Sequence, residues 1–374
     1  MRLDKKSRSW LRQFLEDAQK LSKYDVGETI EGLARKLNKK PSEILKLNSN
    51  ENFFVPKAFL KMILDEVIEE VDPRIYPRDE KVELEKSLGR YVNVSPRQIV
   101  IGEGSDQLID LVSRAFLRHG DKALSIAPTF SMYERCIRIQ GAKFETIPLR
   151  EDFSLDIDGI LDSARSNAKL LFLCSPNNPT ANQFGAEEIQ HLVEEFNGLV
   201  IVDEAYVEFS EQSIASLTEK NENLIVLRTF SKAFGLAGLR LGYAISNIDL
   251  ASTLSERFQM PYSATLITLK TGMKLLKRIE VIKKAIEELE AERKNLIKRL
   301  NGMSDVHAFN SQTNFVLMQV GKSSDEVDKT LLNRGVIIRN LGRVLHLRNC
   351  LRVTVAPPDM TERFITELRK VLNE

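Results

Sequence analysis

Short apolar segments alternate with helical patterns between residues 98 and 228, and this alternation is the strongest constraint on how the chain can fold. The apolar segments cover residues 98–101, 123–126, 143–147, 170–174, 199–202 and 224–228. Strands that are apolar on both faces are typical of parallel sheets that helices cover on each side. The pattern therefore predicts an α/β domain with a mostly parallel sheet, whose ligands would bind at the carboxyl ends of the strands.

The last third of the chain has a different pattern. Residues 265–300 carry leucine and isoleucine at helical spacing among many charged residues, which predicts one very long helix. Strand patterns at 314–320, 336–339 and 351–355 then predict a small α+β domain. A length of 374 residues accommodates two domains. We expect an N-terminal arm and part of the small domain over 1–50, a large domain over 51–264, and the interdomain helix with the small domain over 265–374.

Charge and composition narrow the classes of partner. Acidic and basic residues nearly cancel, with a formal net charge of +1, so neither nucleic acid nor a membrane surface is expected as a partner. The N-terminus is charged and amphipathic, unlike a signal peptide, and no apolar run approaches the ~20 residues of a membrane span. The three cysteines form no CxxC pair, which favours a reducing, cytoplasmic setting. The four histidines are scattered, so no metal site is expected.

The segment TFSKAFGLAGLRLG (229–242) carries the clearest chemical signal. Lys232 directly follows a buried strand, where poor solvation would lower its pKa and make it a nucleophilic amine. Thr229, Ser231 and Arg240 surround it with two hydroxyls and a guanidinium, a set suited to a phosphate group. The alternative is an ordinary surface lysine in a loop, and the other strand-end clusters decide between the two.

A second polar cluster ends the segment 199–202. Asp203 would be a costly buried carboxylate without a cationic partner, and the protonated pyridine nitrogen of pyridoxal 5′-phosphate (PLP) would be such a partner. Tyr206 could then hydrogen-bond to the phenolic oxygen of the same ring. The alternative, equally open from these residues alone, is that Asp203 caps a following helix.

Two further clusters follow other predicted strands. In SPNNPT (175–180), prolines and asparagines impose an ordered loop in which Asn178 could donate to the same phenolic oxygen, or which could be only a rigid turn. In GEGSD (102–106), Ser105 and the backbone amide of Asp106 would open a helix, whose N-terminus binds phosphate readily. An ordinary strand-to-helix turn is the alternative there.

Taken in this order, the clusters resemble those of the fold-type I PLP-dependent aminotransferases, and more narrowly the histidinol-phosphate aminotransferase family. The resemblance runs from about Tyr24 to the C-terminus. The matching stretches are LKLNSNENF (45–53), YPRDE (76–80), GEGSDQLIDLVSRAF (102–116), PTFSMY (128–133), CSPNNPT (174–180), VDEAYVEF (202–209), TFSKAFGLAGLRLGY (229–243), TNFVLM (313–318), GVIIRNL (335–341) and CLRVTV (350–355). The family implies a seven-stranded sheet between helices in the large domain, PLP as cofactor, and a homodimer.

The resemblance also assigns roles residue by residue. Lys232 forms the Schiff base and carries protons, Asp203 pairs with the pyridine nitrogen, and Tyr206 and Asn178 bind the phenolic oxygen. The remaining cofactor contacts that it implies are Phe130 on the ring and Ser105, Asp106, Thr229, Ser231, Arg240 and the other subunit's Tyr76 at the phosphate.

Substrate contacts are implied in the same way. Arg352 matches the arginine for the substrate carboxylate, and Arg339 matches a second arginine for a phosphate or for the distal carboxylate of glutamate. Tyr24 and Asn50 fall where the family's N-terminal segment closes over the substrate. Surface solvation is the alternative for both arginines.

The resemblance implies transamination between L-histidinol phosphate and 2-oxoglutarate. Two alternatives keep the fold: an aromatic or broad-range amino-acid aminotransferase, and a PLP-dependent threonine-phosphate decarboxylase. A regulator built on an aminotransferase body would need a DNA-binding domain, for which the N-terminal arm is too short. The chain departs from the family pattern at Ala181, where glycine is usual, and there we expect an ordinary negative φ.

Overall fold

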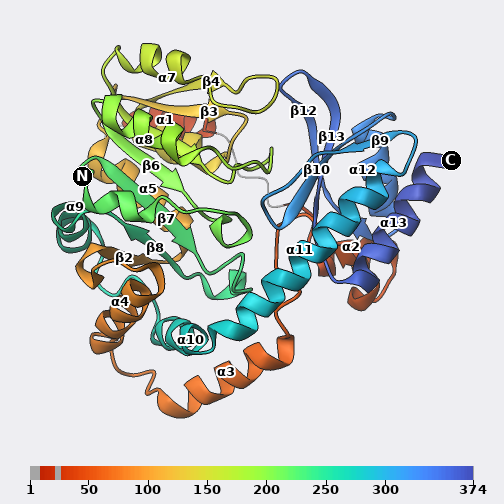
Figure 1. The fold of residues 1–374 in the computed structure, drawn as a ribbon, viewed down its shortest axis with the longest axis horizontal. Coiled ribbons are helices and arrows are strands. Elements are labelled where there is room, and N and C mark those ends of the chain that lie inside the picture. Colours follow the sequence, from red (N-terminus) through yellow and green to blue (C-terminus); the bar gives the residue numbers. More distant parts are fainter. Residues whose placement is uncertain (1–8, 22–26, 374) are drawn as a thin grey trace, which may run out of the picture.

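The computed structural model describes residues 9–21 and 27–373. A seven-stranded sheet forms the centre of the larger part, in the order β2-β8-β7-β6-β5-β3-β4. Its strands are β2 (Ile99–Gly102), β3 (Lys122–Ala127), β4 (Lys143–Pro148), β5 (Ala168–Cys174), β6 (Leu199–Asp203), β7 (Leu224–Thr229) and β8 (Gly242–Ile245). All neighbours pair in parallel except β8, which is antiparallel to both β2 and β7. The predicted mostly parallel α/β sheet is confirmed (Figure 1).

Alternate residues of the central strands enter two separate apolar cores. In β7, Leu224 and Val226 pack into one core, whereas Ile225 and Leu227 pack into the other. Because both faces of the sheet are covered, the strands are apolar throughout. The helices of this part are α3 (Lys57–Glu70), α4 (Asp79–Val92), α5 (Gly104–Phe116), α6 (Met132–Ile139), α7 (Ile157–Ala164), α8 (Ala186–Glu195), α9 (Ile248–Thr253) and α10 (Leu266–Lys277).

Six of these strands were predicted from the sequence, and β8 was not. This strand has only four residues and begins at the end of the glycine-containing loop after Lys232. A four-residue apolar segment next to a loop gives little periodicity, so its place between β2 and β7 depends on long-range pairing.

A second, antiparallel sheet of order β12-β13-β10-β9 forms the core of the smaller part. Its elements are β9 (Val306–Ala308), β10 (Phe315–Val320), β12 (Arg339–Val344) and β13 (Leu347–Thr354), with α11 (Ile279–Asn301), α12 (Ser324–Asn333) and α13 (Pro358–Asn373). Residues near the N-terminus join it, because β1 (Leu45–Lys46) pairs in parallel with β11 (Val336–Ile337), near α2 (Ile30–Leu37). An α+β arrangement was expected for this region.

The single long helix predicted over 265–300 is wrong, because the structure has two helices there. α10 ends at Lys277 and α11 begins at Ile279, with Arg278 between them at φ −118° and ψ 34°. Arg278 donates from Nη2 to Glu66 on α3 at 2.9 Å, while α10 packs against α3 and α4. Tertiary contacts therefore break a stretch whose own helical propensity is continuous, and α11 crosses to the smaller part (Figure 1).

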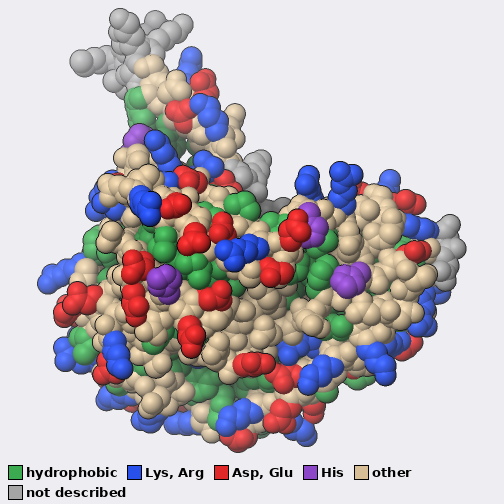
Figure 2. Space-filling model, turned by 45° about the horizontal axis from the view of Figure 1, so that its top comes forward, with side chains coloured by type: hydrophobic (Ala, Val, Ile, Leu, Met, Phe, Trp, Pro, Cys, Tyr) green, Lys and Arg blue, Asp and Glu red, His purple; other side chains and the backbone are tan. Residues whose placement is uncertain are grey.

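The surface carries charges of both signs. Figure 2 shows acidic and basic side chains intermixed over one face of the molecule. The described helix nearest the N-terminus, α1 (Ser9–Gln19), has no buried side chain. No helix among the described residues combines the length and apolar character needed to cross a membrane.

Candidate active site

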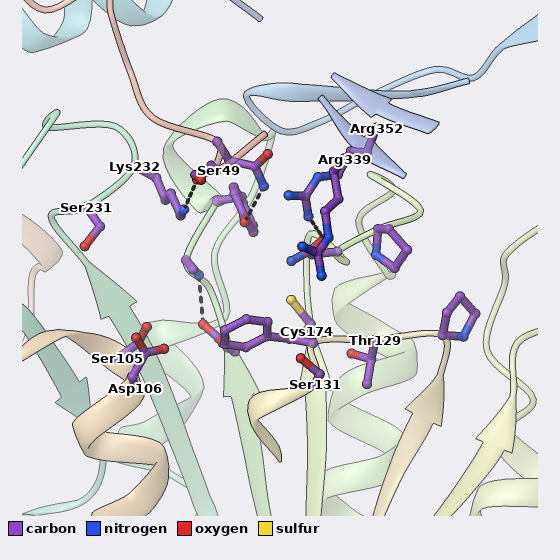
Figure 3. A pocket seen from close by; sticks show the side chains of 18 of the residues that line it. Ser49, Ser105, Asp106, Thr129, Ser131, Cys174, Ser231, Lys232, Arg339 and Arg352 are labelled. Atoms are coloured by element: carbon purple, nitrogen blue, oxygen red, sulfur yellow. Dashed lines mark hydrogen bonds between the residues drawn. The ribbon is translucent and has the colours of Figure 1, made fainter. Parts of the chain in front are cut away.

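A cavity of about 550 Å³ lies between the carboxyl ends of the large sheet and the β12–β13 hairpin. Most of the sequence-predicted site residues meet there. Those that line it are Asn50, Ser105, Asp106, Phe130, Asn178, Asp203, Tyr206, Thr229, Ser231, Lys232, Arg240, Arg339 and Arg352. Figure 3 shows Lys232 beside Ser49, with Arg339 and Arg352 across the cavity.

The Lys232 side chain is half-buried at the cavity and its amine contacts the backbone. Its Nζ donates to the carbonyl oxygen of Ser49 at 3.1 Å. Burial lowers the pKa of Lys232 to about 8, and the positive charge of Arg352 adds to that effect. A substantial fraction of the amine is therefore uncharged near pH 8, as a nucleophile or proton acceptor requires.

Asp203 ends β6 with its carboxylate buried against the cavity. Its Oδ2 accepts from the Tyr133 hydroxyl at 2.8 Å and its Oδ1 from the Ala205 amide at 3.1 Å. Burial raises the pKa of Asp203 to about 6, although both hydrogen bonds work against that rise. Only a short 3₁₀ turn, Val207–Phe209, follows it, and Tyr206 is the residue at its N-cap, so Asp203 caps no α-helix.

Tyr133 was missed by the sequence analysis. It is fully buried on α6 and stacks on Phe172, with ring centroids 5.0 Å apart. The available signal was its place in PTFSMY (128–133), three residues after Phe130.

Across the cavity from Lys232, hydrogen bonds from a guanidinium and a side-chain amide join the two parts of the molecule (Figure 3). Arg352 donates from Nη1 to Asn178 Oδ1 at 2.6 Å and from Nη2 to the Asn48 carbonyl at 2.7 Å. Asn50 donates from Nδ2 to the Tyr206 hydroxyl at 2.9 Å. In the structure Asn50 thus contacts a predicted cofactor residue, and its own Oδ1 is buried without a hydrogen-bond partner among the described residues.

A cradle of donors surrounds the N-terminus of α5. Arg240 donates from Nη1 to Ser231 Oγ at 3.4 Å and from Nη2 to Asp106 Oδ2 at 2.9 Å. A Cβ on Gly104, which has φ +76°, would lie 2.7 Å from Arg240 Nη2. A Cβ on Gly242 would lie 2.5 Å from the Gly104 carbonyl carbon. The glycines therefore allow β8, α5 and the guanidinium to approach closely around one anion-sized site.

The predicted residue Tyr76 does not line this cavity. Tyr76 is 70% exposed and stacks on Tyr262, with ring centroids 4.5 Å apart. Tyr24 lies outside the described residues.

The expectation of an ordinary φ at Ala181 is wrong. Ala181 has φ +65° and is fully buried. Its amide donates to the Asn177 carbonyl at 2.8 Å, and its carbonyl accepts from the Gln312 amide at 2.7 Å. These two contacts hold the left-handed turn in place although alanine lacks the conformational freedom of glycine.

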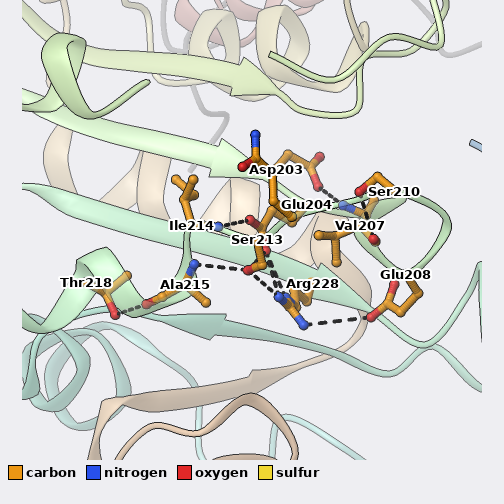
Figure 4. Close-up of polar contacts among 12 residues, drawn as sticks. Asp203, Glu204, Val207, Glu208, Ser210, Ser213, Ile214, Ala215, Thr218 and Arg228 are labelled. Carbon is orange, nitrogen blue, oxygen red and sulfur yellow. Dashed lines mark hydrogen bonds and ion pairs between the residues drawn. The ribbon is translucent and has the colours of Figure 1, made fainter. Parts of the chain in front are cut away.

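A buried charged cluster lies behind the site (Figure 4). Arg228 Nε donates to Glu204 Oε2 at 2.9 Å, its Nη2 donates to Ser213 Oγ at 2.5 Å, and Glu208 lies 4.0 Å away. The charged side chains are at most 8% exposed. Burial raises the pKa of Glu208 to about 7, with Arg228 opposing that rise. The cluster joins Glu204, which follows Asp203, to Arg228, which precedes Thr229.

The family model for aminotransferase class I and II matches residues 42–372. The chain belongs to the class I and II aminotransferases. A histidinol-phosphate aminotransferase from Caldanaerobacter subterraneus subsp. tengcongensis is 37% identical over 88% of this chain and 93% of that protein.

Solved structures agree with the family. Histidinol-phosphate aminotransferase from Sinorhizobium meliloti, in complex with PLP, aligns with a TM-score of 0.85 and 25% identity, covering 93% of this chain and 96% of that one. L-threonine-O-3-phosphate decarboxylase from Porphyromonas gingivalis shares the fold, with a TM-score of 0.77 and 23% identity, over 88% of this chain and 100% of that one.

This aminotransferase is a PLP-dependent enzyme, and its donor set fits the cofactor. One end of the cavity has hydroxyls, a guanidinium and a helix N-terminus, which suit a phosphate, and its floor has a buried carboxylate, which suits a protonated ring nitrogen. Among the described residues, no group of three His, Cys, Asp or Glu side chains could hold a metal ion.

Proposed function

We propose that this aminotransferase transfers the amino group of L-histidinol phosphate to 2-oxoglutarate, giving imidazole-acetol phosphate and glutamate in histidine biosynthesis. The observation that carries the proposal is a buried lysine amine facing a wall of arginines across one cavity. The similarity to histidinol-phosphate aminotransferases supports the substrate. We place the enzyme in the cytoplasm.

The cofactor contacts of this proposal come from the resemblance to the family, and the presence of these residues in one cavity supports them. Asp203 would pair with the ring nitrogen, Tyr206 and Asn178 with the phenolic oxygen, and Phe130 with the ring face. The phosphate would be held by Ser105, the Asp106 amide, Thr229, Ser231 and Arg240. When bound, PLP supplies an electron sink that makes the substrate Cα–H bond acidic.

Lys232 would move the proton in this reaction. Its Nζ takes the proton from the substrate Cα and later releases it, which requires an amine that is neutral part of the time. The lowered pKa of about 8 meets that requirement near neutral pH. Arg352 and Arg339 would bind the anionic groups of the two substrates, since a guanidinium forks onto a carboxylate or a phosphate.

The active unit would be a homodimer in which each subunit supplies Tyr76 to the other's cofactor phosphate. In the single chain Tyr76 is exposed and points to no group of its own cavity. Other large apolar side chains are also at least half exposed: Ile75, Met260 and Tyr262. Exposed apolar side chains of this kind suggest a protein–protein interface.

The absorbance spectrum of the purified enzyme with PLP tests this proposal. We expect a visible band from lysine-bound PLP that disappears when L-histidinol phosphate is added. Lys232→Ala should lack the band and lose roughly 10³-fold or more of turnover. Lys220→Ala, at an exposed position outside the cavity, serves as the control.

The alternatives give different outcomes. A band that responds to glutamate and phenylalanine but not to histidinol phosphate would favour a broad-range aminotransferase. Release of CO₂ from L-threonine phosphate would favour the decarboxylase reaction of the P. gingivalis relative. No band at all would overturn the assignment of Lys232.

A further inference from the structure

The β12 strand contributes more to the cavity than the predicted Arg339. Leu341, Arg343 and Val344 of the same strand line it as well. The pairing of β12 with β13 is irregular between Asn340 and Val344, so consecutive residues as well as alternate ones reach the cavity wall opposite Lys232. Arg343 matches none of the residues assigned above to cofactor or substrate.

The Arg343 guanidinium is anchored along one edge. Its Nε donates to the Leu345 carbonyl at 2.7 Å, within the turn between β12 and β13, where Leu345 has φ +53°. Its Nη1 and Nη2 donate to no acceptor among the described residues, and the side chain is exposed at the cavity mouth. A guanidinium oriented by one bond loses less entropy when its remaining donors engage a ligand.

Charge is distributed unevenly around the cavity. On the large-sheet side, Asp106 faces Arg240 and Asp203 lies near Lys232. The β12–β13 wall contributes three arginines and, among the described residues, no carboxylate to the lining. That wall therefore suits a ligand group with more than one negative charge.

A phosphate monoester is such a group. It carries roughly −1.5 to −2 charge at pH 7 and three strong acceptor oxygens, whereas a carboxylate carries a single charge and two oxygens. One forked guanidinium satisfies a carboxylate, but a phosphate can accept from two guanidiniums at once.

We propose that Arg343 is a specificity-determining residue that binds the substrate phosphate and selects phosphorylated amines over unphosphorylated ones. This inference rests on the proposed function and adds to it the residue that discriminates between the two substrates. Arg352 and Arg339 then serve both substrates, and Arg343 serves only the phosphorylated one.

Steady-state kinetics of Arg343→Gln distinguish binding of the substrate phosphate from a contribution to both substrates. We expect the KM for histidinol phosphate to rise about tenfold or more, since a charged hydrogen bond is lost. The KM for glutamate and the absorbance of bound PLP should stay within about twofold, and Arg343→Lys should recover part of the loss. Arg348→Gln is the matched control, because Arg348 is an exposed arginine on β13 that does not line the cavity.

A second measurement does not depend on turnover of histidinol phosphate. Inorganic phosphate should inhibit the reaction of glutamate competitively in the wild type, and at least several-fold more weakly in Arg343→Gln. If both KM values rise equally, or if neither the KM for histidinol phosphate nor phosphate inhibition changes, the inference is wrong. Failure of the wild type to use histidinol phosphate would instead contradict the proposed function, and phosphate inhibition would still test Arg343.

Discussion

Two buried ionisable residues of the site have pKa values displaced in opposite directions by the same cause. Burial disfavours the charged form, so it lowers the pKa of Lys232 to about 8 and raises the pKa of Asp203 to about 6. The protein without cofactor holds a desolvated carboxylate at neutral pH, with two hydrogen bonds but no ion pair to a described residue. A cationic ring nitrogen would relieve that cost.

Asp203→Asn should therefore stabilise the cofactor-free protein at neutral pH while weakening its hold on PLP. The folded-state pKa of Asp203 lies above its ordinary value of 3.8, so the stability contributed by this group is present below pH 3.8 and is lost as the pH rises through about 6. Asparagine does not titrate. The difference in Tm between variant and wild type should grow from pH 4.5 to pH 7.5 in thermal unfolding.

Asp249→Asn, at an exposed carboxyl on α9, is the control for that experiment. A difference in Tm that is the same at both pH values would show that the Asp203 carboxylate carries no desolvation cost. Equal PLP affinity of variant and wild type would contradict the proposed pairing with the ring nitrogen.

At the scale of elements, the ends of β6 and β7 place some residues in the cavity and the neighbouring residues in a buried ion pair on the opposite face of the sheet. Asp203 and Thr229 line the cavity, whereas Glu204 and Arg228, each one residue away, form the buried cluster behind it. Successive residues of a strand point to opposite faces, so each of these cavity-lining positions is adjacent in sequence to a supporting one. The Glu204 amide also donates to the Leu227 carbonyl at 2.8 Å, extending the pairing of the two strands.

Arg228→Met should lower the free energy of unfolding by about 3–5 kcal/mol, because it leaves Glu204 buried without its cation. Urea unfolding of the cofactor-free protein measures this loss. The double variant Arg228→Met with Glu204→Gln should lose less than the single variant, since it removes one of the two buried carboxylates, Glu204 and Glu208, that Arg228 neutralises. A double variant that is additively worse would indicate that the ion pair itself contributes little.

At the scale of the whole molecule, the cavity depends on both parts of the chain. The larger part supplies the lysine, the carboxylate and the donors for phosphate, and the smaller part supplies Arg339, Arg343 and Arg352. Arg352 donates a hydrogen bond across the boundary to Asn178, which joins the two parts at the cavity. In the proposed dimer, Tyr76 extends this dependence to a second chain.

Coexpression of two inactive variants tests the dimer. In mixed dimers of Lys232→Ala and Tyr76→Ala, one site would combine an intact Lys232 with an intact Tyr76 from the neighbouring subunit. Random pairing leaves about one quarter of all sites intact, so activity should exceed that of either parent. Lys232→Ala paired with Asp203→Asn should give no recovery, because both defects lie in the residues of one chain. No recovery in the first pair would contradict a shared site.

The sequence by itself determined the sheet type and the position of the site. Apolar segments, and the polar residues that follow them, are local sequence patterns. Parallel strands bring their carboxyl ends to one edge of the sheet, independently of the conformation of the loops. Lys232, Asp203, Tyr206 and Asn178 were therefore predicted in one cavity without knowledge of any distance.

Only the tertiary structure decided the features that depend on distant partners. Strand β8 is defined by pairing with β2 and β7, the helix break at Arg278 by contact with α3, and the φ of Ala181 by a bond from Gln312. Arg343 reaches the cavity only because the β12–β13 hairpin folds over the large sheet. Local patterns encode which face a residue takes, but contacts between residues far apart in the chain form only when the whole core packs.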